Sequence, residues 1–201
     1  MKKLLFPGLA LCAITLMSFA LSELPLGAQL PKADHKMKDV TGKEVSLKDA
    51  TKKNGLLVMF SCNTCPYVIK NQERTNDISN YALKSDVGVV LVNSNEGMRS
   101  DEDSYEAMKQ YAKNQGYKWH YVVDTNSELA DAFGAKRTPE AFLFDSKGKL
   151  VYHGAIDDNP SNASAVTRYH LKEAISEMVT GKDITVKTSR SVGCTIKRPK
   201  S

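Results

Sequence analysis

The feature that most constrains the fold is an alternation of short apolar runs with longer helix-compatible segments. Residues 55–61, "GLLVMFS", and residues 87–95, "VGVVLVNSN", are apolar runs of strand length. Such runs are typical of central strands buried on both faces of a sheet. The segment between them, from Cys62 to about Leu83, is compatible with a helix. Strands that alternate with helices predict an α/β domain with a mainly parallel sheet and helices on both faces.

Beyond this central pattern the sequence predicts a first hairpin, a further helix and strand, and a closing hairpin followed by a last helix. Thr41-Gly42 is expected at the turn of the first hairpin, and Ser100 with Asp103 is expected to form a capping box. The expected ranges are 37–47 for the hairpin, 100–116 and 119–124 for the helix and strand, 127–134 for a short helix, 140–157 for the closing hairpin and 163–180 for the last helix.

The N-terminal segment differs from the rest of the chain. Lys2 and Lys3 precede a long apolar stretch without an acid, which ends in the small residues Ser18 and Ala20. This pattern is typical of a cleaved signal peptide, so we expect an exported protein, periplasmic or extracytoplasmic, without stable membrane insertion after cleavage. An uncleaved anchor is the alternative, because the stretch approaches bilayer-spanning length. The expected division is 1–22 signal peptide, 23–34 linker, 35–181 domain and 182–201 C-terminal tail.

Charge and cysteine count narrow the class of protein. The formal net charge of +5 falls to +3 when the two lysines of the signal segment are removed. No basic block interleaved with aromatic residues occurs, so no nucleic-acid partner is expected. Cleavage also leaves three cysteines, Cys62, Cys65 and Cys194, in a compartment where disulfides persist. An odd number indicates one pair and one spare thiol, or a reshuffling trio.

Cys62 and Cys65 lie three positions apart where the predicted buried strand meets the predicted helix. On one helical turn their Cβ atoms would lie about 5–6 Å apart, so a small backbone adjustment allows a bond. So short a ring stabilises the fold by only about 2 kcal/mol, which favours a redox-active pair over a structural staple. Because a helix N-terminus favours a thiolate, we expect Cys62 to be the more exposed, attacking sulfur and Cys65 to resolve the mixed disulfide.

Other roles for the cysteines were weighed against this interpretation. The chain has no second C-x-x-C and no H-x-x-x-H, and its four histidines are scattered, so no metal is expected. Copper binding by the two thiolates and His153 stays open as an alternative. Cys194 is interpreted either as a third redox thiol or as an unpaired or structural cysteine. No organic cofactor is expected, because the sulfurs themselves carry both electrons.

Three segments resemble a known family when they are taken together in order and spacing: "CNTCPYV", "AKRTPEAFLFDSKGKLVYHGAIDD" and the terminal "SVGCTIK". They resemble the thioredoxin-like redoxins of the alkyl-hydroperoxide-reductase/thiol-specific-antioxidant type, and more narrowly a peroxiredoxin-like subgroup. The resemblance covers about residues 32–181. It implies a thioredoxin-like fold in which the helix and strand between residues 101 and 124 are an inserted αβ unit.

The resemblance also implies site residues and partners. Thr138-Pro139 would be a cis peptide bond facing the cysteine pair, and the Thr138 backbone would pair with an extended substrate chain, so both residues are expected to bind substrate. The implied partners are proteins with thiols or disulfides and a separate redoxin that resets the pair.

The sequence departs from its relatives in four respects, one of which is that Asn63-Thr64 stands between the cysteines where thioredoxin has Gly-Pro. Leu56 stands where thioredoxin has a buried acid, and Ser61 stands where it has a tryptophan. Peroxiredoxins have a threonine three residues before the reactive cysteine, where this chain has Cys62. We therefore expect an exported thiol–disulfide oxidoreductase that uses a Cys62–Cys65 pair. A peroxiredoxin-like thiol peroxidase with antioxidant activity and a copper-binding metallochaperone module of thioredoxin fold are the alternatives.

Overall fold

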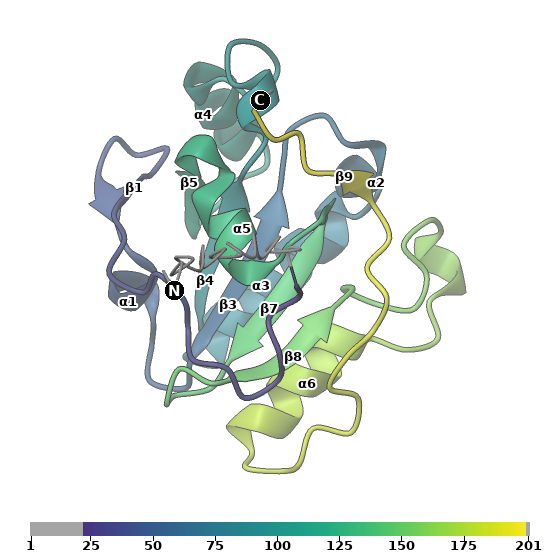
Figure 1. The fold of residues 1–201 in the computed structure, drawn as a ribbon. Coiled ribbons are helices and arrows are strands. Elements are labelled where there is room, and N and C mark those ends of the chain that lie inside the picture. The colour runs from purple at the N-terminus through teal and green to yellow at the C-terminus, as the bar shows by residue number, and fades with distance from the viewer. Residues whose placement is uncertain (1–21, 200–201) are drawn as a thin grey trace, which may run out of the picture.

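A five-stranded mixed sheet forms the centre of the molecule (Figure 1). The computed structural model describes residues 22–199. The strands lie in the order β5-β4-β3-β7-β8; β3 pairs in parallel with β4 and β4 with β5, while β7 pairs antiparallel with both β3 and β8. Their bounds are Leu56–Ser61 for β3, Gly88–Asn93 for β4, His120–Val123 for β5, Glu140–Phe144 for β7 and Leu150–Gly154 for β8.

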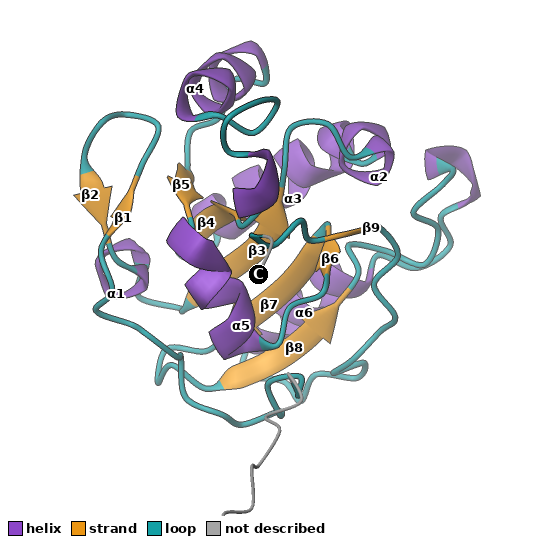
Figure 2. Ribbon diagram, turned by 45° about the horizontal axis from the view of Figure 1, so that its top comes forward, coloured by secondary structure: helices purple, strands orange, loops and turns teal. Residues whose placement is uncertain are grey.

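The apolar runs of the sequence become the middle of this sheet. Every residue of β3 and β4 is buried, because helices cover both faces. One apolar cluster contains side chains of α3, α4 and α6, and a second cluster on the other face contains side chains of α1 and α5. Figure 2 shows α5 in front of the strands. The bounds are Leu47–Ala50 for α1, Gln72–Lys84 for α3, Tyr105–Asn114 for α4, Glu128–Phe133 for α5 and His170–Val179 for α6. The predicted α/β class with helices on both faces is confirmed.

The first hairpin also forms as predicted. Strands β1 (Met37–Lys38) and β2 (Glu44–Val45) pair antiparallel around the turn that contains Gly42. Gly42 has a φ of 88°, a conformation that glycine adopts without the steric cost of a Cβ.

The predicted helix from Cys62 to Leu83 is corrected to two helices. The first, α2, is Pro66–Lys70, and α3 follows after Asn71. Cys65 has an extended backbone at the N-cap of α2, and Pro66 takes the first helical position, where its missing N–H is not needed. Cys62 therefore lies in the turn before the helix.

Two other helix starts differ from the prediction. Helix α4 begins at Tyr105, because the Ser104 side chain accepts the Ala107 N–H; the expected cap at Ser100 is wrong. The last helix begins at His170. Residues 163–165 form only a 3-10 turn, which Asn162 caps through the N–H of Ser164.

The C-terminal segment is tied to the body of the molecule. After α6 it runs beside β8, where Ser189 N–H donates to the His153 carbonyl oxygen. It then forms strand β9 (Cys194–Thr195), which pairs antiparallel with β6 (Arg137–Thr138). Figure 1 shows this segment in yellow along one side of the molecule, and Figure 2 shows β9 beside β6.

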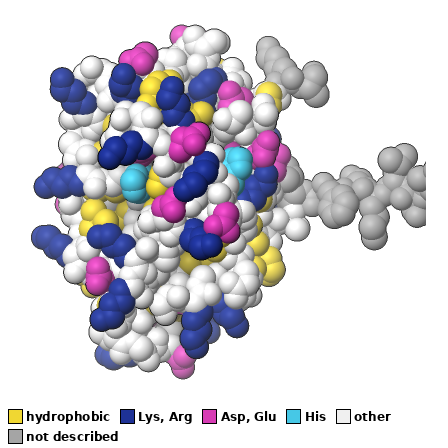
Figure 3. Space-filling model, turned by 90° about the vertical axis from the view of Figure 1, so that its left-hand side faces the viewer, with side chains coloured by type: hydrophobic (Ala, Val, Ile, Leu, Met, Phe, Trp, Pro, Cys, Tyr) yellow, Lys and Arg dark blue, Asp and Glu magenta, His cyan; other side chains and the backbone are white. Residues whose placement is uncertain are grey.

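The surface carries both signs of charge. On the face seen in Figure 3, lysine and arginine side chains are interspersed with acidic ones. None of the helices within residues 22–199 combines the length and apolar character that crossing a membrane requires. Apart from Ser22, the expected signal peptide lies outside the described residues.

Candidate redox site

The three cysteines of the expected mature chain meet at the carboxyl end of β3. Cys62 follows that strand directly, Cys65 caps α2, and Cys194 comes from β9. Together with Thr64, Pro66, Asn95, Met98, Thr195 and Lys197 they line a cavity of about 210 Å³. Cys65 and Cys194 form a disulfide between Cα atoms 6.0 Å apart, whereas Cys62 is a free thiol. A reducible bond and a thiol therefore share one cavity.

Cys62 is buried, with 1% of its surface exposed. Burial raises the pKa of its thiol, and the nearby negative charge of Asp103 acts in the same direction. Hydrogen bonds from Thr138 and from the backbone of Cys65 and Thr64 only partly offset this rise. The expectation of a more exposed, thiolate-favouring Cys62 is thus wrong. The reason is that Cys62 lies before the helix and is enclosed by the surrounding polypeptide.

Thr138 touches both sulfurs of the C-x-x-C motif. The Thr138-Pro139 peptide bond is cis, as predicted. The Thr138 hydroxyl lies 3.4 Å from Cys62 Sγ, and the Thr138 carbonyl oxygen lies 3.3 Å from Cys65 Sγ. The strand neighbour of Thr138 is Cys194. The edge expected to receive a substrate chain is therefore paired with the C-terminal segment of the protein itself.

Asp103 is a buried site residue that the sequence reasoning missed. It is 0% exposed, and its Oδ1 accepts the backbone N–H of Asn63 at 2.9 Å. The side-chain amide of Asn93 also donates to Oδ1 at 2.7 Å, and that of Asn95 donates to Oδ2 at 2.8 Å. These bonds satisfy a buried carboxylate and fix the turn between the two cysteines. The polar run "NSN" at the end of the second buried strand is a sequence signal for such a site, whereas the expected capping box gives Asp103 a different role.

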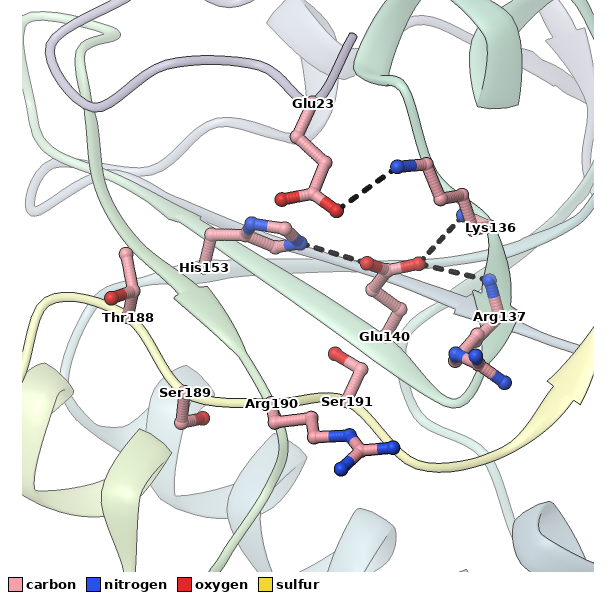
Figure 4. Close-up of a pocket in the computed structure, with 9 residues that line it drawn as sticks. All are labelled: Glu23, Lys136, Arg137, Glu140, His153, Thr188, Ser189, Arg190 and Ser191. Atoms are coloured by element: carbon pink, nitrogen blue, oxygen red, sulfur yellow. Dashed lines mark hydrogen bonds and ion pairs between the residues drawn. The ribbon is translucent and has the colours of Figure 1, made fainter. Parts of the chain in front are cut away.

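A second buried carboxylate, Glu140, supports strand β6 from the other side. Its Oε2 accepts the N–H groups of Lys136 at 2.8 Å and Arg137 at 2.9 Å, and its Oε1 lies 2.8 Å from His153 Nε2 (Figure 4). Burial alone raises the pKa of Glu140, but the hydrogen bonds from His153 and the two backbone groups outweigh it and leave that pKa lowered. Glu140 thereby holds the strand that presents Thr138.

The surroundings of His153 bear on the copper alternative. Its ring stacks on Phe142 with centroids 4.2 Å apart, and it lines a separate cavity of about 700 Å³ whose lining contains no cysteine. Within residues 22–199 no three His, Cys, Asp or Glu side chains are grouped so that they could hold a metal ion.

Arg137 is exposed, and its guanidinium donates to the Gly193 carbonyl oxygen at 3.2 Å.

The thioredoxin-like fold, with a thiol and a disulfide together beside a cis-proline, defines the class of this protein: it is an oxidoreductase. Residues 25–168 match the family model described as Redoxin. The chain belongs to the redoxin family.

Solved structures share the fold of this chain. An uncharacterized conserved protein from Geobacillus kaustophilus is 35% identical, with a TM-score of 0.82 over 88% of this chain and 94% of that chain. A hypothetical protein from Sinorhizobium meliloti 1021 is 31% identical, with a TM-score of 0.81 over 90% and 98%. The thioredoxin domain of a thiol-disulfide oxidoreductase from Bacteroides vulgatus shares the fold at 20% identity, with a TM-score of 0.53 over 65% and 89%. No curated protein matches the chain.

Proposed function

We propose that this redoxin is an exported thiol–disulfide oxidoreductase in which Cys62 and Cys65 exchange two electrons with the disulfides of partner proteins. The observation that carries the proposal is the shared cavity, where the Cys62 thiol and the Cys65–Cys194 disulfide meet beside Thr138. A bond between Cys62 and Cys65 themselves stays a prediction, because the structure holds the pairing of Cys65 with Cys194.

The reaction balances as two exchanges. A site thiolate attacks one sulfur of a partner disulfide, so that a mixed disulfide forms and the partner's other sulfur leaves as a thiolate. The second site cysteine then attacks the site sulfur of the mixed disulfide. The Cys62–Cys65 bond forms and the partner's remaining sulfur leaves, so the partner gains two electrons and the pair loses them.

Cys194 completes the cycle by exchange without a net change of electrons. Its thiolate attacks Cys65 in the Cys62–Cys65 bond, which leaves Cys62 as a thiol and produces the observed Cys65–Cys194 disulfide. A dithiol redoxin then resets the pair by the same chemistry, so the proposal needs no organic cofactor.

Thiol trapping followed by mass spectrometry, on the exported protein across a series of redox buffers, tests this proposal. We expect one two-electron transition in which Cys65 always takes part and both the Cys62–Cys65 and Cys65–Cys194 bonds appear. The Cys194→Ser variant is the matched control and should retain the Cys62–Cys65 bond and reduce a small disulfide. If Cys62 stays a free thiol in that variant at every poise, the proposed pair does not exist.

The Cys65–Cys194 bond also favours a second candidate, a thiol peroxidase. A Cys65 thiolate that attacks a hydroperoxide becomes a sulfenic acid and releases an alcohol, or water in the case of hydrogen peroxide; condensation with the Cys194 thiol then gives the observed disulfide and one molecule of water. Peroxide consumption should in that case survive Cys62→Ser and disappear with Cys65→Ser. Equal losses in both variants, or no consumption by the wild type, would exclude the peroxidase.

A further inference from the structure

The C-terminal strand occupies the edge of β6 beside the cysteines. Cys194 lies opposite Thr138 and Thr195 opposite Arg137 in the antiparallel register, and Ile196 N–H donates to the Lys136 carbonyl oxygen at 3.0 Å. The pairing is made through the main chain, as when an extended peptide adds to a sheet edge. The segment differs from a foreign peptide only in being part of the same polypeptide.

Gly193 allows this strand to approach so closely. A Cβ at this position would lie 2.1 Å from the carbonyl oxygen of Thr138 and 3.2 Å from the nitrogen of Pro139. Both are backbone atoms of the segment that Glu140 holds in place, so a larger residue cannot be admitted by turning a side chain. The residue directly before the bonded cysteine therefore has to be glycine.

The two positions after Cys194 differ in what they demand. Ile196 is 3% exposed and belongs to the apolar cluster that includes side chains of α5. Thr195, between them, is exposed. The edge of β6 thus favours an aliphatic side chain two residues after the cysteine and leaves the intervening position open to a wide range of side chains.

We propose that the C-terminal strand is a tethered mimic of the partner. The partner is an extended, cysteine-containing segment in which glycine directly precedes the reacting cysteine and an aliphatic residue stands two positions after it. This inference rests on the proposed thiol–disulfide exchange and adds to it the class of polypeptide that the site accepts. It also assigns Cys65 as the sulfur that bonds the partner, because Cys65 is the sulfur bonded to Cys194.

The exchange steps follow from that position. The Cys65 thiolate of the reduced protein attacks the partner cysteine in its disulfide, and the partner's other sulfur leaves as a thiolate. The Cys62 thiolate then attacks Cys65, forms the Cys62–Cys65 bond and releases the partner cysteine as the second thiol. The Cys194 thiolate afterwards attacks Cys65 in the Cys62–Cys65 bond, which forms the Cys65–Cys194 disulfide and releases Cys62. Strand β9 then pairs with β6, so that a further partner cannot pair with this edge.

Chromogenic peptides test the inference. The peptide RSVGCTIK, which copies residues 190–197, is prepared with its cysteine in a disulfide to thionitrobenzoate and mixed with the reduced full chain carrying Cys194→Ser. Release of coloured thionitrobenzoate reports the attack. The peptide that carries Gly193→Val should react at least about tenfold more slowly, whereas one that carries Thr195→Lys should react as fast as the original.

A third peptide, with Ile196→Lys, should also be slow. The resident tail competes equally with every peptide, so it does not affect the ratios. Acid quenching during the first turnover, followed by fragment mapping, should find the peptide on Cys65. Equal rates for the glycine and valine peptides, or a peptide bonded first to Cys62, would overturn the inference.

Free dithiobis(nitrobenzoate) separates the two levels of the proposal. This small disulfide needs no strand pairing, so its reduction tests the cysteine pair alone. If it reacts and produces a Cys62–Cys65 bond while the peptides show no preference, only the mimic is refuted. If it produces no Cys62–Cys65 bond, the proposed function fails as well.

Discussion

At the scale of single residues, two neighbours have opposite effects on the pKa of the buried Cys62 thiol. Burial and the charge of Asp103 raise that pKa, and the Thr138 hydroxyl at 3.4 Å lowers it. Because burial is the largest of these effects, the pKa of the Cys62 thiol is raised above its usual value.

The first prediction concerns the pH dependence of Cys62. Because only the thiolate reacts with an alkylating agent, the midpoint of the alkylation rate in the Cys65–Cys194 form should lie above about 8.5, the pKa of a free thiol. Asp103→Asn should move the midpoint downward, since it removes the charge that disfavours the thiolate. A stopped-flow pH profile measures both. A wild-type midpoint at or below that of a free cysteine would contradict the prediction.

The second prediction concerns Glu140. A carboxyl with a lowered folded-state pKa stabilises the fold above its unfolded pKa, and this contribution is lost as the pH falls through the lower, folded pKa. Acidification from about pH 7 to about pH 3.5 should therefore reduce the free energy of unfolding less in Glu140→Gln than in the wild type. Urea unfolding at the two pH values measures the difference. Glu44→Gln, at an exposed site, is the comparison for general charge effects.

At the scale of elements, the short strands β6 and β9 position Thr138 and Cys194 in the site. Strand β6 is held by Glu140 on one side and receives β9 on the other. The β9 segment is anchored further by Arg198, whose Nε donates to Asp131 at 2.7 Å, and by Gly97 N–H, which donates to the Lys197 carbonyl oxygen at 2.8 Å. Main-chain pairing and side-chain contacts, as well as the disulfide, thus hold the C-terminal segment against β6.

The third prediction is that Gly193→Val in the full chain weakens this closure. The added side chain meets the Thr138 backbone, so the ratio of Cys65–Cys194 to Cys62–Cys65 bonds should fall about tenfold for each 1.4 kcal/mol of strain. Disulfide mapping of the oxidised protein measures the ratio. Thr195→Val, at an exposed position of the same strand, should leave it unchanged. An unchanged ratio in the valine variant at position 193 would show that β9 does not need its close approach.

At the scale of the whole molecule, the disulfide joins residues 129 positions apart and so links the start of α2 to β9. Closing a loop of that length restricts the unfolded chain much more than the short ring between Cys62 and Cys65 would. The Cys65–Cys194 bond thereby contributes to the stability of the fold.

The fourth prediction follows from that loop. Cys194→Ala should lower the free energy of unfolding by about 4–5 kcal/mol at most, from the chain-entropy estimate for so long a loop. Cys62→Ala, which leaves the disulfide in place, should cost less, about 1–3 kcal/mol for a small buried side chain. Denaturant unfolding under non-reducing conditions compares them. A larger loss in Cys62→Ala than in Cys194→Ala would contradict the assigned contribution.

The sequence by itself determined the elements whose signals are local. The apolar runs 55–61 and 87–95 indicated buried strands, and Thr41-Gly42 indicated the turn of the first hairpin, because periodicity and turn chemistry act over a few residues. The resemblance added the cis bond at Pro139 and the redoxin class. Helix starts were less certain, since a capping side chain such as Ser104 competes with near neighbours like Ser100.

Only the tertiary structure decided how the site is assembled. The pairing of Cys65 with Cys194, the burial of Cys62 and the role of Asp103 depend on contacts between segments that are far apart in the chain. No local pattern encodes them, because burial and hydrogen-bond partners exist only once the strands and the tail have packed together. The same reason explains why Gly193, unremarkable in the sequence, lies against the backbone of Thr138.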